Sequence, residues 1–268
     1  MNKLSTNQLS ISYGENTIID DLNIQIPEGK ITILVGSNGC GKSTLLRSLC
    51  RLLKPALGTV VLDGNDIFKM STRDVARKLA VLPQGPTAPE GLTVMQLVRQ
   101  GRYPHQNWLQ QWTSEDEEMV QKALLDTKMN DIAHRTIDSL SGGQRQRAWI
   151  AMTLAQGTDM LLLDEPTTYL DLAHQIEVLD LLYELNAKEK RTIVMVLHDL
   201  NLSCRYGHYM IALSNRSVYA EGAPEEVMTA ETVRNVFGME CEISIDPIFG
   251  TPLLIPHGKG RRINNSKA

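Results

Sequence analysis

The segment GSNGCGKST, from Gly36 to Thr44, constrains this 268-residue chain more than any other. It follows an apolar, β-branched run from Ile31 to Val35, and it precedes a helical pattern of leucines that stops at Pro55. A strand, a glycine-rich loop and a helix in this order are typical of an α/β protein whose loop leaves the carboxyl end of a buried strand.

The loop itself has the composition and spacing of a phosphate-binding loop. Gly36, Gly39 and Gly41 let successive backbone N–H groups point at phosphate oxygens, close to the positive end of the following helix. Lys42 can reach the terminal phosphates, and the Ser43 hydroxyl can ligate Mg²⁺. A glycine-rich turn without a ligand is the alternative, and the full spacing in this context favours the phosphate site. The candidate phosphate-binding residues of the loop are Gly36, Ser37, Asn38, Gly39, Cys40, Gly41, Lys42, Ser43 and Thr44.

Two further apolar runs end in ionisable residues. Met160 to Leu163 leads into Asp164 and Glu165, and Ile193 to Leu197 leads into His198. Adjacent residues on a strand point to opposite faces, so one carboxylate can hold Mg²⁺ while the other accepts a proton from water. His198 would emerge at the same edge of the sheet. A solvated turn and a structural histidine are the alternatives for these two strand ends.

A third feature is the stretch DSLSGGQRQRAWIAM, which begins at Asp138 and predicts an amphipathic helix. Ser141 and Gln144 have the spacing of an N-terminal capping box. Gly142 and Gly143 fill the first turn, where each should cost about 0.5–1 kcal/mol relative to alanine. Helix stability alone therefore does not account for these two glycines.

In their order along the chain, these segments resemble the ATPases of ATP-binding cassette (ABC) transporters. The resemblance covers about residues 5 to 245. Its elements are a Walker A loop (36–44), a Q-loop (81–84), the LSGGQ signature (140–144), a Walker B strand with its catalytic glutamate (161–166), a D-loop (167–171) and a switch histidine in VLHD (196–199).

The resemblance implies a head-to-tail homodimer that encloses two ATP molecules with Mg²⁺. It implies catalytic roles for Glu165 and His198, and ATP contacts from Tyr13, Gln84 and Asp164 in addition to the loop. The Mg²⁺ ligands would be Ser43, Gln84 and Asp164. The ATP of the partner subunit would be contacted by Ser141, Gly142, Gly143, Gln144 and Asp171. The bare glycines would then leave backbone N–H groups open to the γ-phosphate.

The implied architecture is α/β, with a P-loop NTPase (RecA-like) core, an antiparallel β flank and an inserted α-helical subdomain. We expect a single ABC ATPase domain over 1–245, with core segments 1–83 and 159–245, a helical subdomain over 84–158 and a C-terminal extension over 246–268. Strand patterns occur at 9–11, 24–26 and 60–62. Ser114 is expected to cap a helix, and the basic tail HGKGRRINNSKA is expected to be a solvated end rather than a lipid-binding patch.

Composition limits the partners. A net charge of −4 gives no general attraction to nucleic acid, and four scattered cysteines indicate reduced thiols in a cytosolic protein. The first residues show no signal-peptide pattern, and no apolar run reaches the roughly 20 residues that a membrane span needs. A membrane role therefore requires a partner that spans.

A narrower resemblance concerns cargo. GRYPHQ (101–106), VLHDLN and DPIFGTPLLIP are similar to segments of bacterial iron-chelate importer ATPases, nearest to the ferric enterobactin (catecholate siderophore) type. This implies integral membrane permease subunits, indirectly a substrate-binding protein, and a peripheral location on the cytoplasmic face of the bacterial membrane. Vitamin B12 and haem importers share much of the pattern, so the cargo stays open. Ser37 replaces the more usual proline of this loop.

An ABC-type ATPase acting on DNA or ribosomes is a rival class. Such chains usually carry a long coiled-coil insertion or two cassettes, and this chain has one cassette and no heptad run. A P-loop kinase is a second rival, and it would leave LSGGQ and the Q-loop without a role. Both features favour the importer.

Overall fold

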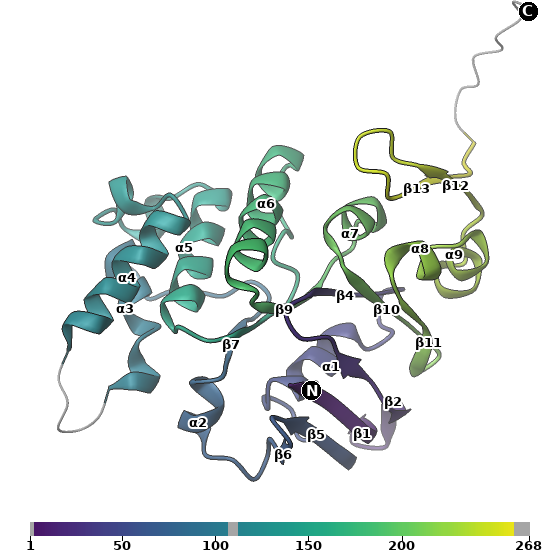
Figure 1. The fold of residues 1–268 in the computed structure, drawn as a ribbon, viewed down its shortest axis with the longest axis horizontal. Helices are drawn as coiled ribbons and strands as arrows, with labels where there is room; N and C mark the ends of the chain where they lie inside the picture. The colour runs from purple at the N-terminus through teal and green to yellow at the C-terminus, as the bar shows by residue number, and fades with distance from the viewer. Residues whose placement is uncertain (1–2, 107–111, 260–268) are drawn as a thin grey trace, which may run out of the picture.

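A six-stranded sheet forms the centre of the molecule (Figure 1), in a computed structural model that describes residues 3–106 and 112–259. The strand order is β11-β10-β4-β9-β8-β7, and every neighbouring pair is parallel except the β10–β11 hairpin. The strands are β4 (Ile31–Gly36), β7 (Leu79–Leu82), β8 (Met160–Leu163), β9 (Thr192–Val196), β10 (Tyr209–Ser214) and β11 (Ser217–Gly222). Strands β4, β8 and β9 are buried along their whole length, as continuous apolar runs predict for parallel strands covered on both faces.

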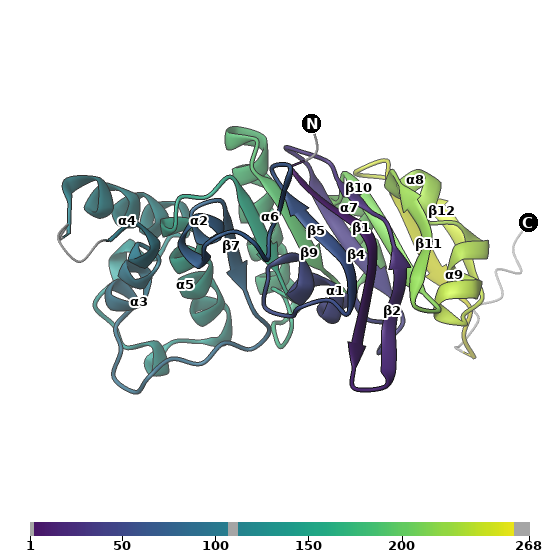
Figure 2. The same cartoon turned by 90° about the horizontal axis from the view of Figure 1, so that it is seen from below.

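The amino-terminal part of the chain forms a second, antiparallel sheet (Figure 2). It contains β1 (Leu4–Tyr13), β2 (Asn16–Leu22), β3 (Gln25–Ile26), β5 (Leu57–Leu62) and β6 (Asn65–Asp66). Its inward residues share one hydrophobic core with α1 (Lys42–Leu49) and with one face of the central sheet, which contributes Leu34, Leu162 and Val194. The predicted antiparallel flank is confirmed; β1 and β5 are longer than the patterns at 9–11 and 60–62 indicated, and β3 is shorter than the pattern at 24–26.

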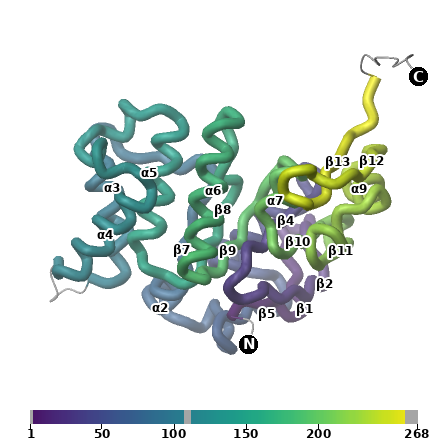
Figure 3. Tube along the Cα trace, turned by 45° about the horizontal axis from the view of Figure 1, so that its top comes forward, coloured from purple at the N-terminus to yellow at the C-terminus, as the bar shows by residue number. Residues whose placement is uncertain are grey.

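Helices cover the opposite face of the central sheet and extend beyond one end of it. The covering helices include α6 (Leu172–Glu189) and α7 (Leu200–Tyr206). Three more, α3 (Val94–Gln100), α4 (Ser114–Asp126) and α5 (Gly142–Ala155), gather together beyond β7 (Figures 1 and 3). The remaining helices of the described residues are α2 (Thr72–Ala76), α8 (Pro224–Val227), α9 (Ala230–Phe237) and three 3₁₀ turns at Tyr103–His105, Asn130–Ile132 and Ile137–Ser139. Within the described ranges, no helix is both long enough and apolar enough to cross a bilayer.

The start of α4 differs from the sequence expectation, because Thr113 rather than Ser114 is its cap. The Thr113 hydroxyl accepts the backbone N–H of Asp116 at 3.2 Å, and the Asp116 carboxylate accepts the backbone N–H of Thr113 at 3.0 Å. Either hydroxyl could cap a helix, and each is followed three positions later by an acidic residue. In the structure, the reciprocal pair of hydrogen bonds forms between Thr113 and Asp116. Ser114 is therefore the first helical residue.

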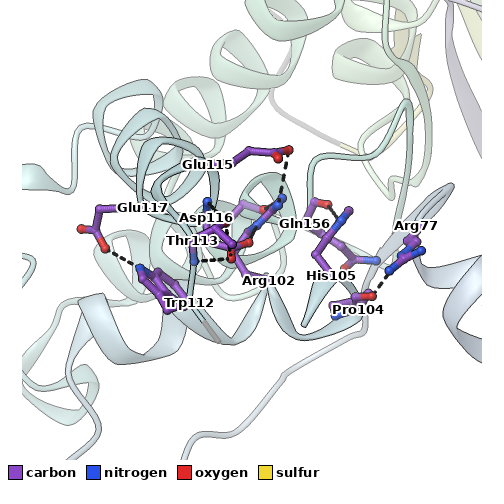
Figure 4. A network of polar contacts seen from close by, with 11 residues as sticks. Arg77, Arg102, Pro104, His105, Trp112, Thr113, Glu115, Asp116, Glu117 and Gln156 are labelled. Atoms are coloured by element: carbon purple, nitrogen blue, oxygen red, sulfur yellow. Dashed lines mark hydrogen bonds and ion pairs between the residues drawn. The ribbon is translucent and has the colours of Figure 1, made fainter. Parts of the chain in front are cut away.

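The GRYPHQ segment joins the three gathered helices to the rest of the molecule. Arg102 is 2% exposed; its Nε lies 2.7 Å from Oδ1 of the buried Asp116, and its Nη1 donates to the carbonyl of Ala155 (Figure 4). Burial acts to raise the pKa of Asp116, but the hydrogen bonds from Arg102 and Thr113 outweigh it and leave that pKa lowered. A buried pair of this kind is costly to break from one side, so it fixes α3 against α4 and α5.

The same segment also reaches α2 and β7. The Arg77 side chain, which follows α2, donates to the carbonyl of Pro104 at 3.1 Å, and the His105 ring lies 2.8 Å from the carbonyl of Gln156 (Figure 4). The Gln156 amide in turn donates to the carbonyl of Leu79 at 3.2 Å. The segment is thus a junction between the helices at 94–155 and the central sheet.

The described part of the chain ends in a separate hairpin of β12 (Cys241–Ile245) and β13 (Pro252–Pro256). Asn201 of α7 holds it by donating to the carbonyl of Leu254 and accepting the N–H of Leu254. The expected boundary after residue 245 falls between these two strands. Most of the predicted basic tail, residues 260–268, lies outside the described residues.

Candidate nucleotide-binding and hydrolysis site

Four neighbouring strands of the central sheet deliver the candidate residues to one edge. Strand β4 ends in the glycine loop, β9 leads to His198, β8 leads to Asp164 and Glu165, and β7 leads to Gln84. The strands are parallel and in register, and the N–H of Asp164 continues the ladder by donating to the carbonyl of Leu82 at 2.9 Å. Their carboxyl ends therefore meet, as expected for a ligand-binding edge.

Gly36 and Gly41 occupy positions in the loop that favour glycine. At Gly36, with φ of 150°, an added Cβ would lie 2.5 Å from the carbonyl oxygen of Leu213 and 2.6 Å from the Cys40 sulfur. Gly41 has φ of 104° and starts α1 without any side-chain cap. The first N–H groups of α1 are thus left for a ligand, which suits a phosphate. Ser37, Asn38 and Gly39 form the exposed crest of the loop, and Cys40 and Thr44 are half-buried.

Lys42 folds back over the loop. Its side chain is buried, and its ammonium donates to the carbonyls of Gly36 at 2.8 Å and Ser37 at 3.0 Å. An ammonium group held by two loop carbonyls lies where it can exchange those contacts for phosphate oxygens.

Ser43 and Asp164 form the candidate metal-binding pair. The Ser43 hydroxyl donates to Oδ1 of Asp164 at 2.9 Å, and Asp164 is 6% exposed. Burial raises the pKa of Asp164 and outweighs the opposing hydrogen bond from Ser43. Over the described residues, no cluster of three or more His, Cys, Asp or Glu side chains could enclose a metal. A hydroxyl and one carboxylate fit Mg²⁺, which keeps several waters and takes substrate phosphates as further ligands.

Glu165 is held from three directions. Its Oε1 lies 2.7 Å from Nε2 of His198, its Oε2 accepts the Thr168 hydroxyl at 2.9 Å, and Oε2 also accepts the side-chain amide of Gln84. Burial acts to raise the pKa of Glu165, but the hydrogen bonds, led by His198, outweigh it and leave that pKa lowered. The arrangement keeps Glu165 an ionised, oriented proton acceptor.

The structure changes two details of this region. Strand β8 ends at Leu163, and Glu165 has a positive φ of 53°, so a turn rather than strand alternation separates the two carboxylates. Thr168 was not among the predicted site residues. The signal that could have found it is a hydroxyl three residues after the acid, a spacing that lets the side chain turn back.

The predicted partner-facing residues lie on other elements. Ser141 and Gln144 form the capping box of α5, with Gly142 exposed and Gly143 buried between them. Asp171 caps α6 by accepting the N–H of His174. Tyr13 lies at the end of β1, beside the turn to β2, and is about half exposed. The residues at the strand ends therefore lie together, whereas the predicted partner-facing residues lie at the starts of α5 and α6 and Tyr13 lies on the antiparallel sheet.

Comparison with known proteins agrees with this geometry. The family model for ABC transporters matches residues 19–168. The protein named "Probable siderophore transport system ATP-binding protein YusV" of Bacillus subtilis (strain 168) is 66% identical over 98% of this chain and 96% of its own. The petrobactin import ATP-binding protein FpuD of Bacillus anthracis is 65% identical, over 99% of this chain and 97% of its own.

Two further comparisons bear on the narrower resemblance. The ferric enterobactin transport ATP-binding protein FepC of Escherichia coli (strain K12) is 50% identical over 96% of this chain and 95% of its own. A solved ABC transporter in an inward-facing conformation, described as metal-chelate type, superimposes with a TM-score of 0.83 at 28% identity, over 96% of this chain and 98% of that one.

The glycine loop at the carboxyl edge of parallel strands is that of a P-loop nucleotide-binding protein, and the family match and the relatives show that the chain is an ATPase. The matched family model and the relatives go further, and the chain belongs to the ABC transporter family. The predicted fold class, a P-loop core with an antiparallel flank and a group of helices, is confirmed.

Proposed function

We propose that this chain is the ATP-hydrolysing subunit that powers import of a ferric siderophore through a partner membrane permease. The observation that carries the hydrolytic part is Glu165, which is ionised, held by three donors, and placed at the same sheet edge as the glycine loop. The cargo rests on relatives whose names refer to siderophore, petrobactin and ferric enterobactin transport.

The chain's own groups divide the chemistry between them. Lys42 and the first N–H groups of α1 bind the β- and γ-phosphates of ATP, and Tyr13 stacks on the adenine. Ser43, Asp164 and Gln84 would hold Mg²⁺, which would supply positive charge to neutralise the phosphates. For Gln84 this means leaving Glu165, with which it pairs in the structure.

Hydrolysis then depends on Glu165 and His198. Glu165 accepts a proton from the water that attacks the γ-phosphorus, while the bond between that phosphorus and the β–γ bridging oxygen breaks. His198, through its 2.7 Å contact, keeps the Glu165 carboxylate oriented and ionised before the proton arrives. Thr168 supports the other oxygen of the carboxylate.

The second half of each ATP site comes from another copy of the chain. In this proposal the start of α5 and Asp171 of one subunit face the Walker A loop of the other in a head-to-tail homodimer. The surface beside Asp171 supports this, because Tyr169 is 91% exposed and Leu172 is 66% exposed. Large apolar side chains at that exposure suit a face that a partner covers.

The membrane partners follow from the family. Gln84 begins the segment that leads from β7 to the helices at 94–155, and we propose that this helical subdomain, over 84–158, contacts the permease on the cytoplasmic face of the bacterial membrane. A substrate-binding protein would act indirectly by delivering the loaded chelate to the permease. Among cargoes, we favour a catecholate siderophore, on the resemblance of the GRYPHQ and DPIFGTPLLIP segments.

Two measurements test the proposal. A strain lacking this chain should lose uptake of one class of ferric chelate, and uptake assays with catecholate, hydroxamate, haem and vitamin B12 substrates identify which class. In vesicles that contain the complete transporter, the Gln84→Ala variant should still bind ATP. It should lose transport, and the permease and its loaded binding protein should no longer stimulate ATP hydrolysis. Normal uptake of every iron chelate in the deletion strain would refute the cargo. Normal transport per mole of folded Gln84→Ala protein would refute the coupling role.

A further inference from the structure

The start of α5 and the start of α6 touch each other through a glycine. Gly143 is buried, and a Cβ added there would lie 2.4 Å from Cδ2, 2.9 Å from Cγ and 3.2 Å from Cβ of His174. A Cβ added at Gly142 would meet nothing closer than 3.7 Å, from a Leu170 methyl group. The structure of the chain itself therefore explains a glycine at 143, where it makes room for the His174 side chain, but not at 142.

Two hydrogen bonds to Asp171 hold His174 in that position. Its Nδ1 lies 2.7 Å from Oδ1 of Asp171, and its backbone N–H donates to the same oxygen at 2.9 Å. A ring nitrogen facing a carboxylate is a donor, which assigns the proton to Nδ1. The backbone hydrogen bond and then the ring hydrogen bond from His174 lower the pKa of Asp171. The carboxylate thus anchors the ring that fills the space over Gly143.

A second contact joins the same two helices one turn further on. Nη1 of Arg147 on α5 lies 3.6 Å from Oε2 of Glu177 on α6. Residues 143 and 147 are four apart and residues 174 and 177 are three apart, so the two contacts follow one line along adjacent helix faces. Helices α5 and α6 run side by side in both ribbon and tube views (Figures 1 and 3).

We propose that His174 is a positioning residue that joins the signature turn to the D-loop within one subunit. Its ring packs on Gly143 and its Nδ1–H holds Asp171, so the two elements keep a fixed relation. This rests on the proposed function only in assigning both elements to the ATP site of the partner subunit. In that site, His174 would present Ser141, the first N–H groups of α5 and Asp171 to the partner's nucleotide as one preorganised surface.

Thermal unfolding of the isolated chain tests the packing without any ATPase activity. Alanine is a better helix former than glycine, so Gly143→Ala should raise the melting temperature wherever the methyl group fits. With His174 present, the clash should make Gly143→Ala lower the melting temperature by about 2–4 °C. In the His174→Ala background the same change should raise it. Gly142→Ala, the matched control in open space, should have the same sign in both backgrounds.

ATP hydrolysis by the same four-variant cycle tests the positioning role. Gly143→Ala should reduce kcat by on the order of 10-fold or more with the KM for ATP nearly unchanged, because ATP first binds to the other half of the site. The double variant should recover at least about 3-fold over Gly143→Ala alone, since the obstructed ring is gone. Two substitutions separate the two contacts: His174→Phe keeps a ring without the bond to Asp171, and His174→Asn keeps a donor without the ring.

The outcomes test the role of His174 separately from the proposed function. A drop in melting temperature of equal size in both backgrounds, or activity losses that simply multiply in the double variant, would overturn the role of His174. Full kcat in both His174→Phe and His174→Asn would overturn it as well. A wild-type chain that hydrolyses no ATP, while the melting temperatures still change sign, would count against the proposed function and leave the packing of His174 on Gly143 intact.

Discussion

The two groups of residues that we propose as halves of an ATP site are built in opposite ways. The strand-edge half consists of the glycine loop, Gln84, Asp164, Glu165 and His198. Its side chains are bonded to one another across four parallel strands. The helix-start half consists of residues 141–144 and 169–174. Its residues are bonded mainly within their own helix starts, through the capping box of α5 and the Asp171 cap of α6.

This difference shows which parts of the proposed site a single chain can assemble alone and which need a second copy. The strand-edge half already contains a buried carboxylate beside a hydroxyl and a glutamate held by three donors, all within one chain. The helix-start half exposes Tyr169 and Leu172 beside its polar groups. It has the composition of a surface that is completed by association. Substitutions in the strand-edge half should therefore change hydrolysis or ATP affinity, and substitutions in the helix-start half should change dimerisation.

The largest effect is expected in the strand-edge half, at Glu165. Glu165→Gln removes the proton acceptor but keeps the shape of the side chain, so hydrolysis should fall by on the order of 10²-fold or more. Binding of ATP should stay near normal, and the ATP-bound dimer should accumulate. Steady-state hydrolysis and size-exclusion chromatography with ATP provide the measurements.

Thr168→Val is the matched control for this substitution. It removes one 2.9 Å hydrogen bond to the same carboxylate and leaves the acceptor itself in place. Its loss of hydrolysis should be smaller, about 3–10-fold. Turnover of Glu165→Gln equal to that of the wild type would remove Glu165 from the proposed chemistry.

The second effect concerns affinity. Lys42→Ala deletes a buried ammonium that two loop carbonyls now hold, and the phosphates of ATP lose their cation. The dissociation constant for ATP should rise by about 10–100-fold, as expected when a charge-assisted hydrogen bond is lost. Equilibrium titration with a fluorescent ATP analogue measures it on the isolated chain. An unchanged constant would contradict the assignment of the loop as the phosphate site.

The third effect belongs to the helix-start half. Leu172→Asp places a charge in the exposed apolar surface beside Asp171, and burying it against a second copy would be unfavourable. We expect ATP-dependent dimerisation to weaken by about 10-fold, while ATP binding to the monomer stays unchanged. Analytical ultracentrifugation of the Glu165→Gln background, with and without Leu172→Asp, compares the two directly. Equal dimerisation would place the interface elsewhere.

The same contrast explains how much could be predicted from the sequence. The glycine loop, the β8 strand and the capping box of α5 follow from local rules, namely glycine conformations, apolar runs and hydroxyl-to-amide spacing. All three appear in the structure where the sequence indicated. That Glu165 and His198 lie at one edge of the sheet was expected from their positions after apolar strands. That Gln84 joins them was expected only from the resemblance, because strand order is a property of the whole chain.

The contacts that were missed join elements distant in sequence or depend on a turn. The packing of His174 on Gly143 needs the crossing of α5 and α6, which no periodicity specifies. The pairing of Thr168 with Glu165 needs the positive φ of Glu165. At the start of α4, two adjacent hydroxyl residues could both cap, and the choice of Thr113 depended on its reciprocal bond with Asp116. Sequence patterns thus locate helix starts to within a residue and leave cross-element packing undetermined.

The smallest expected effect is a shift in melting temperature that has opposite signs for substitutions of the two neighbouring carboxylates, Asp164 and Glu165. Burial raises the pKa of Asp164, so the folded chain binds a proton there more tightly than the unfolded chain does. The corresponding stability is fully present below the unfolded pKa of about 3.8 and is lost as the pH rises through the raised folded value. At neutral pH the ionised carboxylate therefore destabilises the nucleotide-free chain, and Asp164→Asn should raise its melting temperature by about 1–3 °C.

Glu165→Gln should shift the melting temperature the other way. The pKa of Glu165 is lowered in the folded chain, so its stabilising effect is present above the unfolded pKa of about 4.5 and is lost as the pH falls through the folded value. Removing the charge at pH 7 should thus lower the melting temperature by about 1–3 °C. Calorimetry of both variants at pH 7, without nucleotide or metal, gives the comparison. Shifts of the same sign would mean that the two adjacent carboxylates do not differ in the way their surroundings indicate, with burial dominant at Asp164 and hydrogen bonds dominant at Glu165.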